Sequence, residues 1–218
     1  MEEENQEEKI DPVKQKKMEM QAITLMIVLI LVLASFVTVY SILKPKPYFE
    51  YAQLKVYPVK FEGNMMFYSI PLKFDFGQGP FEENVVLRND PRVIENLSYE
   101  VNESLFKIAA VGFTMEPTLS ANAVIAAQET SKLCKTLKLP IVFGVTNDPE
   151  GKAENVFDCA NATNLTRVIK MELGNDTKVF SNDNCIIVRG DNYDSMIKAS
   201  DKLVVEWLKL ITKKNETS

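Results

Sequence analysis

The side chains that could carry acid–base chemistry in this sequence are carboxylates, because the 218 residues include no histidine. The absence of histidine excludes Ser-His-Asp and Cys-His nucleophiles, and it excludes zinc sites built on imidazole. Asp90 and Glu116 are candidates for the two facing acids of a glycoside hydrolase, which lie about 5–10 Å apart. Nothing in the sequence pairs them. We therefore assign no catalytic residue and expect a protein that is not an enzyme, with a carboxylate-dependent envelope hydrolase as one alternative.

A second group of acids falls in the polar segment 146–164. Carboxylate oxygens suit calcium, but the spacing of these acids does not match the EF-hand loop. The acids are Asp148, Glu150, Glu154 and Asp158. A solvated loop is the favoured interpretation. We accordingly assign no metal-binding or cofactor-binding residue, expect no cofactor and identify no small-molecule substrate.

The three cysteines, Cys134, Cys159 and Cys185, form no Cys-x-x-Cys pair, so a redox enzyme is not expected. Cys134 falls on the apolar face of an expected helix and should be an inert small hydrophobe. Cys159 in an expected loop and Cys185 near an expected strand start are the favoured disulfide pair, although spacing alone does not determine connectivity.

Asn-x-Ser/Thr tripeptides, the acceptors of N-glycosylation, are concentrated in the polar remainder of the chain. Their asparagines are Asn96, Asn102, Asn161, Asn164, Asn175 and Asn215. A single such tripeptide often arises by chance, but six in one polar portion favour a glycosylated domain outside the cytoplasm.

The element that must position this domain is the stretch 22–43, AITLMIVLILVLASFVTVYSIL, which contains no charged residue. A helix needs about 20 apolar residues to cross a bilayer core of ~30 Å, so we expect a transmembrane helix. The stretch is longer than a signal-peptide core and ends in a poor cleavage site, so an uncleaved anchor is favoured over a removed signal. Pro45 and Pro47 then stop the helix.

Lysines flank this stretch on both sides, so the positive-inside rule does not decide its orientation. The acceptor tripeptides indicate the orientation, because all of them follow the stretch 22–43. We expect a single-pass cell-membrane protein with a cytoplasmic N-terminus and an extracytoplasmic C-terminal domain, so the lipid bilayer is one partner. The formal net charge of −5 argues against a nucleic-acid partner.

Composition divides the chain into five expected parts. Residues 1–21 should be a disordered cytoplasmic tail, because they are charged and almost free of large apolar residues. The transmembrane helix at 22–43 is followed by a linker at 44–52. An extracytoplasmic α/β domain at 53–213 and a disordered tail at 214–218 complete the chain.

Two hairpins are expected in the outer domain. Segments 53–61 and 65–76 are rich in aromatic and β-branched residues and flank the turn-forming residues 62–64. Pro58 and Pro71 indicate strands that are edge-like or bulged. Further along, segments 166–173 and 178–188 flank Gly174-Asn175-Asp176, which predicts a second hairpin.

Between the hairpins, the pattern is that of a parallel βαβ unit with its helix at 120–138. A helix expected at 192–211, with Asp191 as a candidate cap, has a continuous apolar stripe. The fold class is therefore α/β, an α+β mixed sheet with two main helices packed on it. The order of elements in the C-terminal half resembles thioredoxin-like folds, without their cysteine motif.

Three segments carry a resemblance to a known family. Residues 87–92 (LRNDPR) and 184–190 (NCIIVRG), followed by the helix that contains 199–203 (ASDKL), resemble an uncharacterised family of archaeal single-pass membrane proteins. The C-terminal strand-Gly-helix segment is also loosely similar to segments of surface-layer proteins. The resemblance spans most of the outer domain and implies topology and lineage. It implies no activity, and no functional residue is transferred from it.

These features favour a membrane-anchored interaction or structural protein of the cell envelope, held to an envelope or membrane protein partner. One alternative is an accessory subunit of a membrane protein complex, with the stretch 22–43 as the contact. That stretch has few small residues, so close helix packing of the small-xxx-small type is not evident.

Overall fold

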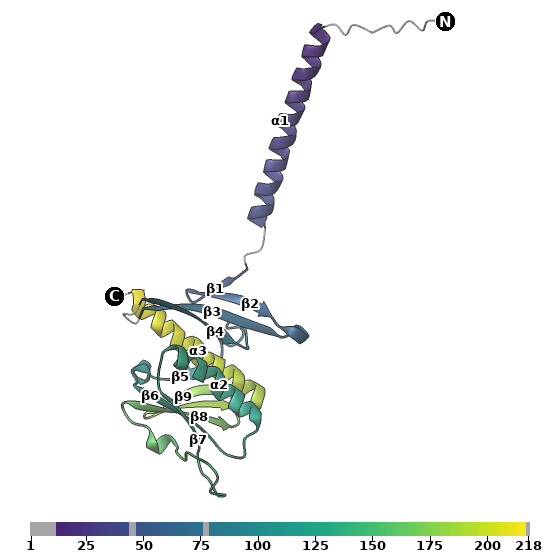
Figure 1. The fold of residues 1–218 in the computed structure, drawn as a ribbon. Coiled ribbons are helices and arrows are strands. Elements are labelled where there is room, and N and C mark those ends of the chain that lie inside the picture. The colour runs from purple at the N-terminus through teal and green to yellow at the C-terminus, as the bar shows by residue number, and fades with distance from the viewer. Residues whose placement is uncertain (1–11, 44–46, 76–78, 217–218) are drawn as a thin grey trace. The chain divides into compact units, whose positions relative to one another are not determined.

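A computed structural model describes residues 12–43, 47–75 and 79–216 (Figure 1). The chain divides into two compact units, Met1–Lys46 and Pro47–Ser218. Residues 1–11 and 217–218 of the expected tails, and residues 44–46 of the expected linker, lie outside the described residues.

In its described residues the first unit is a single helix, α1 (Pro12–Leu43). The section Met20–Tyr40 is long and apolar enough to cross a membrane, about 30 Å at 1.5 Å per residue. Its large apolar side chains are between 45% and 71% exposed. The helix begins at Pro12 and not at residue 22, so part of the expected disordered tail is helical.

The second unit begins with an antiparallel four-stranded sheet in the order β1-β2-β3-β4. Its strands are β1 (Phe49–Tyr51), β2 (Leu54–Lys60), β3 (Met66–Asp75) and β4 (Pro80–Leu87). The predicted first hairpin is confirmed, with the short 3-10 helix η1 (Glu62–Asn64) as its turn. Pro58 and Pro71 each lie in a part of a strand that pairs on one side only, which is why a missing N–H is tolerated there.

A six-stranded mixed sheet follows, in the order β5-β9-β10-β8-β6-β7. Its strands are β5 (Ser98–Glu100), β6 (Ala110–Met115), β7 (Ile141–Val145), β8 (Thr166–Leu173), β9 (Lys178–Asn182) and β10 (Cys185–Gly190). β6 and β7 are parallel neighbours joined through α2 (Ala121–Thr136), so the predicted βαβ unit is confirmed.

The helices α2 and α3 (Tyr193–Glu216) form a middle layer between the two sheets (Figure 1). One continuous core joins all three layers, because each sheet turns its apolar face toward the helices. Fully buried members of this core include Val56, Ile70, Leu87, Phe113, Ala127, Ile186 and Leu203. The mixed α/β class is therefore confirmed, but the expected single sheet is wrong, because the N-terminal strands form a separate sheet on the far side of the helices.

The predicted second hairpin is also wrong. The segment 178–188, expected to be one strand, breaks at Asp183, which adopts a left-handed φ of 49°. β9 and β10 form the hairpin across this turn, and β8 pairs with β10 in parallel. The C-terminal half is thus βαβ followed by βββα, so the thioredoxin-like order is not confirmed.

The helix starts are set by polar side chains. Ser120 caps α2 by accepting a hydrogen bond from the N–H of Asn122. α3 is capped by Asn192, whose Oδ1 accepts from the N–H of Ser195 at 2.9 Å, and not by the expected Asp191.

Candidate functional site

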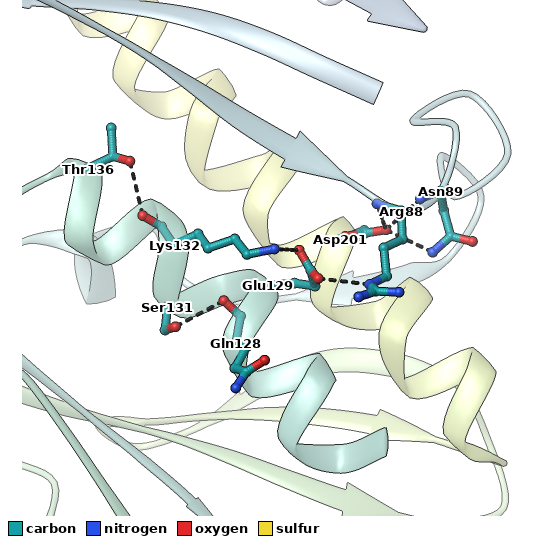
Figure 2. Close-up of polar contacts among 8 residues, drawn as sticks. All are labelled: Arg88, Asn89, Gln128, Glu129, Ser131, Lys132, Thr136 and Asp201. Atoms are coloured by element: carbon teal, nitrogen blue, oxygen red, sulfur yellow. Dashed lines mark hydrogen bonds and ion pairs between the residues drawn. The ribbon is translucent and has the colours of Figure 1, made fainter. Parts of the chain in front are cut away.

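A buried pair of carboxylates lies where α2, α3 and the end of β4 meet (Figure 2). Glu129, in the middle of α2, has a side chain that is only 2% exposed. Its Oε1 accepts a hydrogen bond from Nε of Arg88 at 2.8 Å, and its Oε2 accepts one from Nζ of Lys132 at 2.8 Å. Both cationic side chains are partly exposed. Two cations thus compensate the burial of the Glu129 charge.

Asp201 enters the same cluster from α3 and is completely buried. Its Oδ2 accepts hydrogen bonds from the backbone N–H groups of Arg88 (3.1 Å) and Asn89 (2.8 Å) and from Nδ2 of Asn89 (2.8 Å). Its Oδ1 has no hydrogen-bond partner among the described residues. Burial raises the pKa of Asp201 to about 7, and the nearby charge of Glu129 adds to the rise while these hydrogen bonds oppose it. Asp201 therefore exchanges a proton near neutral pH.

The pair suits a structural role better than hydrolysis. The two acids of a glycoside hydrolase flank the scissile bond of a bound sugar, so both must be open to the substrate. Glu129 and Asp201 are closed off from solvent by α2, α3 and the end of β4. Through Arg88 and Asn89, the two carboxylates tie the end of β4 to both helices.

Neither acid of this pair is among the residues that the sequence singles out, although Asp201 leaves a signal. It lies four residues after Ile197 and three before Val204, so it falls on the apolar stripe of α3. Glu129 leaves a weaker signal, because α2 is buried on more than one face and its polar Thr130 and Ser131 are buried too.

The two carboxylates considered for hydrolase chemistry have different surroundings. Asp90, in the turn after β4, accepts hydrogen bonds from the Arg92 guanidinium, the shortest at 2.6 Å. The bonds from Arg92 hold the pKa of Asp90 below its usual range. Glu116 follows β6 and is exposed. The candidate Asp90 is thus committed to an ion pair within its own turn.

Three of the four acids considered as calcium ligands form hydrogen bonds or ion pairs in or next to their loop, and the fourth, Glu154, is exposed. Asp148 accepts hydrogen bonds from the backbone N–H groups of Glu150 and Ala153, and both Glu150 and Asp158 form ion pairs with lysines. Within residues 12–43, 47–75 and 79–216, no three His, Cys, Asp or Glu side chains gather as a possible metal site.

Five of the six acceptor asparagines are exposed. Asn96 and Asn102 lie on either side of β5, Asn161 and Asn164 lie in the loop before β8, and Asn175 lies in the turn after β8. The sixth, Asn215, falls in the last turn of α3, and its side chain is outside the described part. None of the six lies on β1–β4, α2 or β7.

Cys159 and Cys185 form a disulfide, with their Cα atoms 5.2 Å apart, which is the pair that the sequence favoured. The bond ties the loop after β7 to β10, on the sheet face opposite the helices. The ring of Phe157 packs on the same face above Gly112 and Gly144, where a Cβ atom would collide with it. Cys134 is buried in α2, and burial raises the pKa of its thiol to about 12.

A shallow groove of about 380 Å³ lies between α2, β7 and the segment 153–155. Val124 and Phe143, each 41% exposed, supply its apolar surface, and Gln128 is a polar member of its lining. The backbone edge of β7 is partly covered, because Val145 donates to the carbonyl of Asn155 and Asn155 Nδ2 donates to the carbonyl of Phe143. The groove therefore offers side chains and not an open strand edge.

The fold defines a mixed α/β protein whose N-terminal helix is apolar enough to cross a membrane. No protein-family model matches the chain, and no curated protein or solved structure is significantly similar to it. The function is therefore inferred from the geometry of the chain itself.

Proposed function

We propose that this chain is a membrane-anchored interaction or structural protein of the cell envelope, without enzymatic activity. α1 spans the cell membrane once, the N-terminus is cytoplasmic, and the α/β unit is extracytoplasmic and glycosylated. The principal support is α1, whose apolar side chains remain exposed over a length that matches a bilayer core. The resemblance to archaeal single-pass membrane proteins agrees with this location.

The polar side chains of α1 are consistent with a helix that spans alone. The hydroxyls of Thr24, Ser35 and Thr38 each donate to a carbonyl of the preceding turn, at 2.8, 2.7 and 2.7 Å. No hydroxyl of these three therefore requires a partner helix in the hydrocarbon, where an unpaired polar group is costly. This arrangement favours a simple anchor over an accessory subunit that assembles through α1.

The groove between α2 and β7 is the surface that we assign to a protein partner. Val124 and Phe143 are each 41% exposed in the groove, although the Phe143 ring also stacks on the buried ring of Phe113. Apolar patches rimmed by polar groups mark interaction sites. Glycans at the described acceptor sites would project from other elements. A partner could thus reach the groove on a fully glycosylated domain.

The test is site-specific photo-crosslinking of the full chain in native membranes. A photoreactive phenylalanine analogue replaces Phe143 in the groove, Leu173 on another exposed apolar position, or Phe36 in α1. We expect a discrete crosslinked protein from Phe143 and none from Leu173. Crosslinks from Phe36 alone would support the accessory-subunit alternative, and equal patterns from Phe143 and Leu173 would refute the groove.

Topology is measured on the same preparation. Mass spectrometry should find glycans on the acceptor asparagines, and protease added to intact cells should cleave after residue 47 but not in the N-terminal tail. Unmodified asparagines together with a protected α/β unit would contradict the extracytoplasmic location.

A further inference from the structure

A cluster of exposed apolar side chains lies at the β2–β3 hairpin of the second unit. We define the hairpin patch as Val59, Phe61, Met65, Met66 and Phe67, which flank the turn η1. Phe61 is 57% exposed and Met65 is 56% exposed. Among the ring pairs described, the Phe61 ring contacts only the ring of Phe67, with 5.1 Å between the two centroids. Burying apolar side chains of this size lowers the free energy, so the hairpin patch is a candidate binding surface.

The topology of the four-stranded sheet indicates which part of the chain lies near the hairpin patch. β1 and β2 are antiparallel, with Phe49 opposite Val56. The first residue of β1 therefore lies at the same end of the sheet as the last residue of β2, where the hairpin turn follows. The hairpin patch and the point of chain entry share one end of this sheet.

The chain before β1 is a short tether. Only residues 44–48 separate the end of α1 from β1, and such a segment spans about 20 Å when fully extended. If α1 is anchored in a bilayer, the lipid surface is present at the chain-entry end at a high effective concentration. Even weak contacts at that end are then populated.

The side chains around the hairpin patch suit a lipid interface. Aromatic residues and methionine enter the boundary between headgroups and acyl chains, and lysine stems reach along apolar surface to keep the ammonium in water. Lys55 and Lys60 are exposed on β2, and Glu50 of β1 lies opposite Lys55. Contact should therefore depend mainly on apolar insertion, with the lysine ammonium groups held at the headgroups.

We propose that the hairpin patch inserts into the headgroup region of the membrane that holds α1, so that the α/β unit has a second, reversible contact with lipid. This inference rests on the anchored topology proposed above. It adds a lipid-binding surface at the β2–β3 hairpin, on a different sheet from the groove assigned to the protein partner.

Spin-label depth measurement on the full chain tests the inference. The chain is reconstituted in vesicles of phosphatidylcholine and phosphatidylglycerol, with one cysteine introduced as Met65→Cys, Lys152→Cys or Leu31→Cys. Native thiols do not interfere, because Cys134 is buried and the other two cysteines form the disulfide. Collision of the label with oxygen, which partitions into lipid, is compared with collision with a water-soluble nickel complex.

We expect the label at Met65 to favour oxygen several-fold over the label at Lys152, an exposed loop position, and to lose the difference when Phe61→Ser is added. A Met65 label as accessible to nickel as the Lys152 label, with a Leu31 label in hydrocarbon, would overturn the inference and leave the anchor intact. A Met65 label shielded from both reagents would overturn it in favour of a protein contact. A Leu31 label in water would overturn the anchor and the inference together.

Discussion

Replacing Asp201 by asparagine should remove a large part of the pH dependence of stability in the α/β unit. The carboxamide oxygen can accept the three hydrogen bonds that Oδ2 now accepts from Arg88 and Asn89. The amide nitrogen would occupy the place of Oδ1, which has no partner among the described residues. The substitution thus keeps the shape of the cluster and removes only its titration.

The magnitude follows from the change in the Asp201 pKa on folding, from 3.8 to about 7. Between these values the folded state holds one proton more than the unfolded state, so the free energy of unfolding falls by about 1.4 kcal/mol per unit rise in pH. The stabilisation is fully present below about pH 4 and is lost above about pH 7. From about pH 5 to about pH 8, the wild type should lose about 3 kcal/mol relative to Asp201→Asn.

Trp207 makes the measurement direct, because it is the single tryptophan and lies buried in α3. Urea unfolding of the full chain in detergent, followed by its fluorescence, gives the free energy of unfolding at each pH. Asp183→Asn, on an exposed turn, is the matched control and should leave the pH profile unchanged. Asp201→Ala should destabilise at every pH, by about 3 kcal/mol or more, because it leaves three donors unpaired.

Parallel pH profiles for the wild type and Asp201→Asn would refute the reasoning. They would mean that the buried carboxyl does not gain a proton on folding. The cluster would then hold two negative charges at neutral pH, from Glu129 and Asp201, against the cations Arg88 and Lys132.

Two further predictions concern the loop that covers the outer face of the six-stranded sheet. Replacing Cys159 and Cys185 by serine should cost about 3 kcal/mol, because the bond closes a loop of 26 residues, and non-reducing peptide mapping should recover the linked peptides from the wild type. Gly144→Ala should destabilise by about 1–3 kcal/mol in urea unfolding, because the new Cβ would lie 2.7 Å from the backbone oxygen of Asn155, which cannot rotate away. Gly112→Ala should cost less, since the three atoms nearest to the new Cβ all belong to the side chain of Phe157; an equal or larger cost at Gly112 would contradict this ranking.

Elements with a strong local signal were predictable from the sequence. The apolar run of α1, the turn residues of the β2–β3 hairpin and the βαβ spacing around α2 each depend on contacts within a short segment. The break between β9 and β10 also has a local sequence signal, the run of turn-forming residues Asn182-Asp183-Asn184. It was missed because Gly174-Asn175-Asp176 offers an equally good turn, and only strand pairing decides between them.

The carboxylate pair and the second sheet could not be read in the same way, because both depend on how layers stack. Hydrophobic periodicity assumes that a helix has one buried face and one wet face. α2 and α3 lie between two sheets and pack against each other, so each helix is buried on more than one face. Glu129 on such a helix looks like a surface position in the sequence, and only the place of Asp201 on the apolar stripe of α3 hints at its burial.

The same layering explains why each of the two acids, Glu129 and Asp201, has hydrogen-bond donors close to it. An acid at a buried position of the middle layer cannot reach water, so it must find donors inside the fold or give up its charge. Glu129 forms ion pairs with Arg88 and Lys132, whose side chains are partly exposed to solvent. Asp201 Oδ2 accepts from three donors, and Oδ1 has no partner among the described residues, so burial keeps Asp201 protonated up to near neutral pH. The end of β4 supplies donors to both acids, so the N-terminal sheet is held to the middle layer by polar contacts as well as by the shared apolar core.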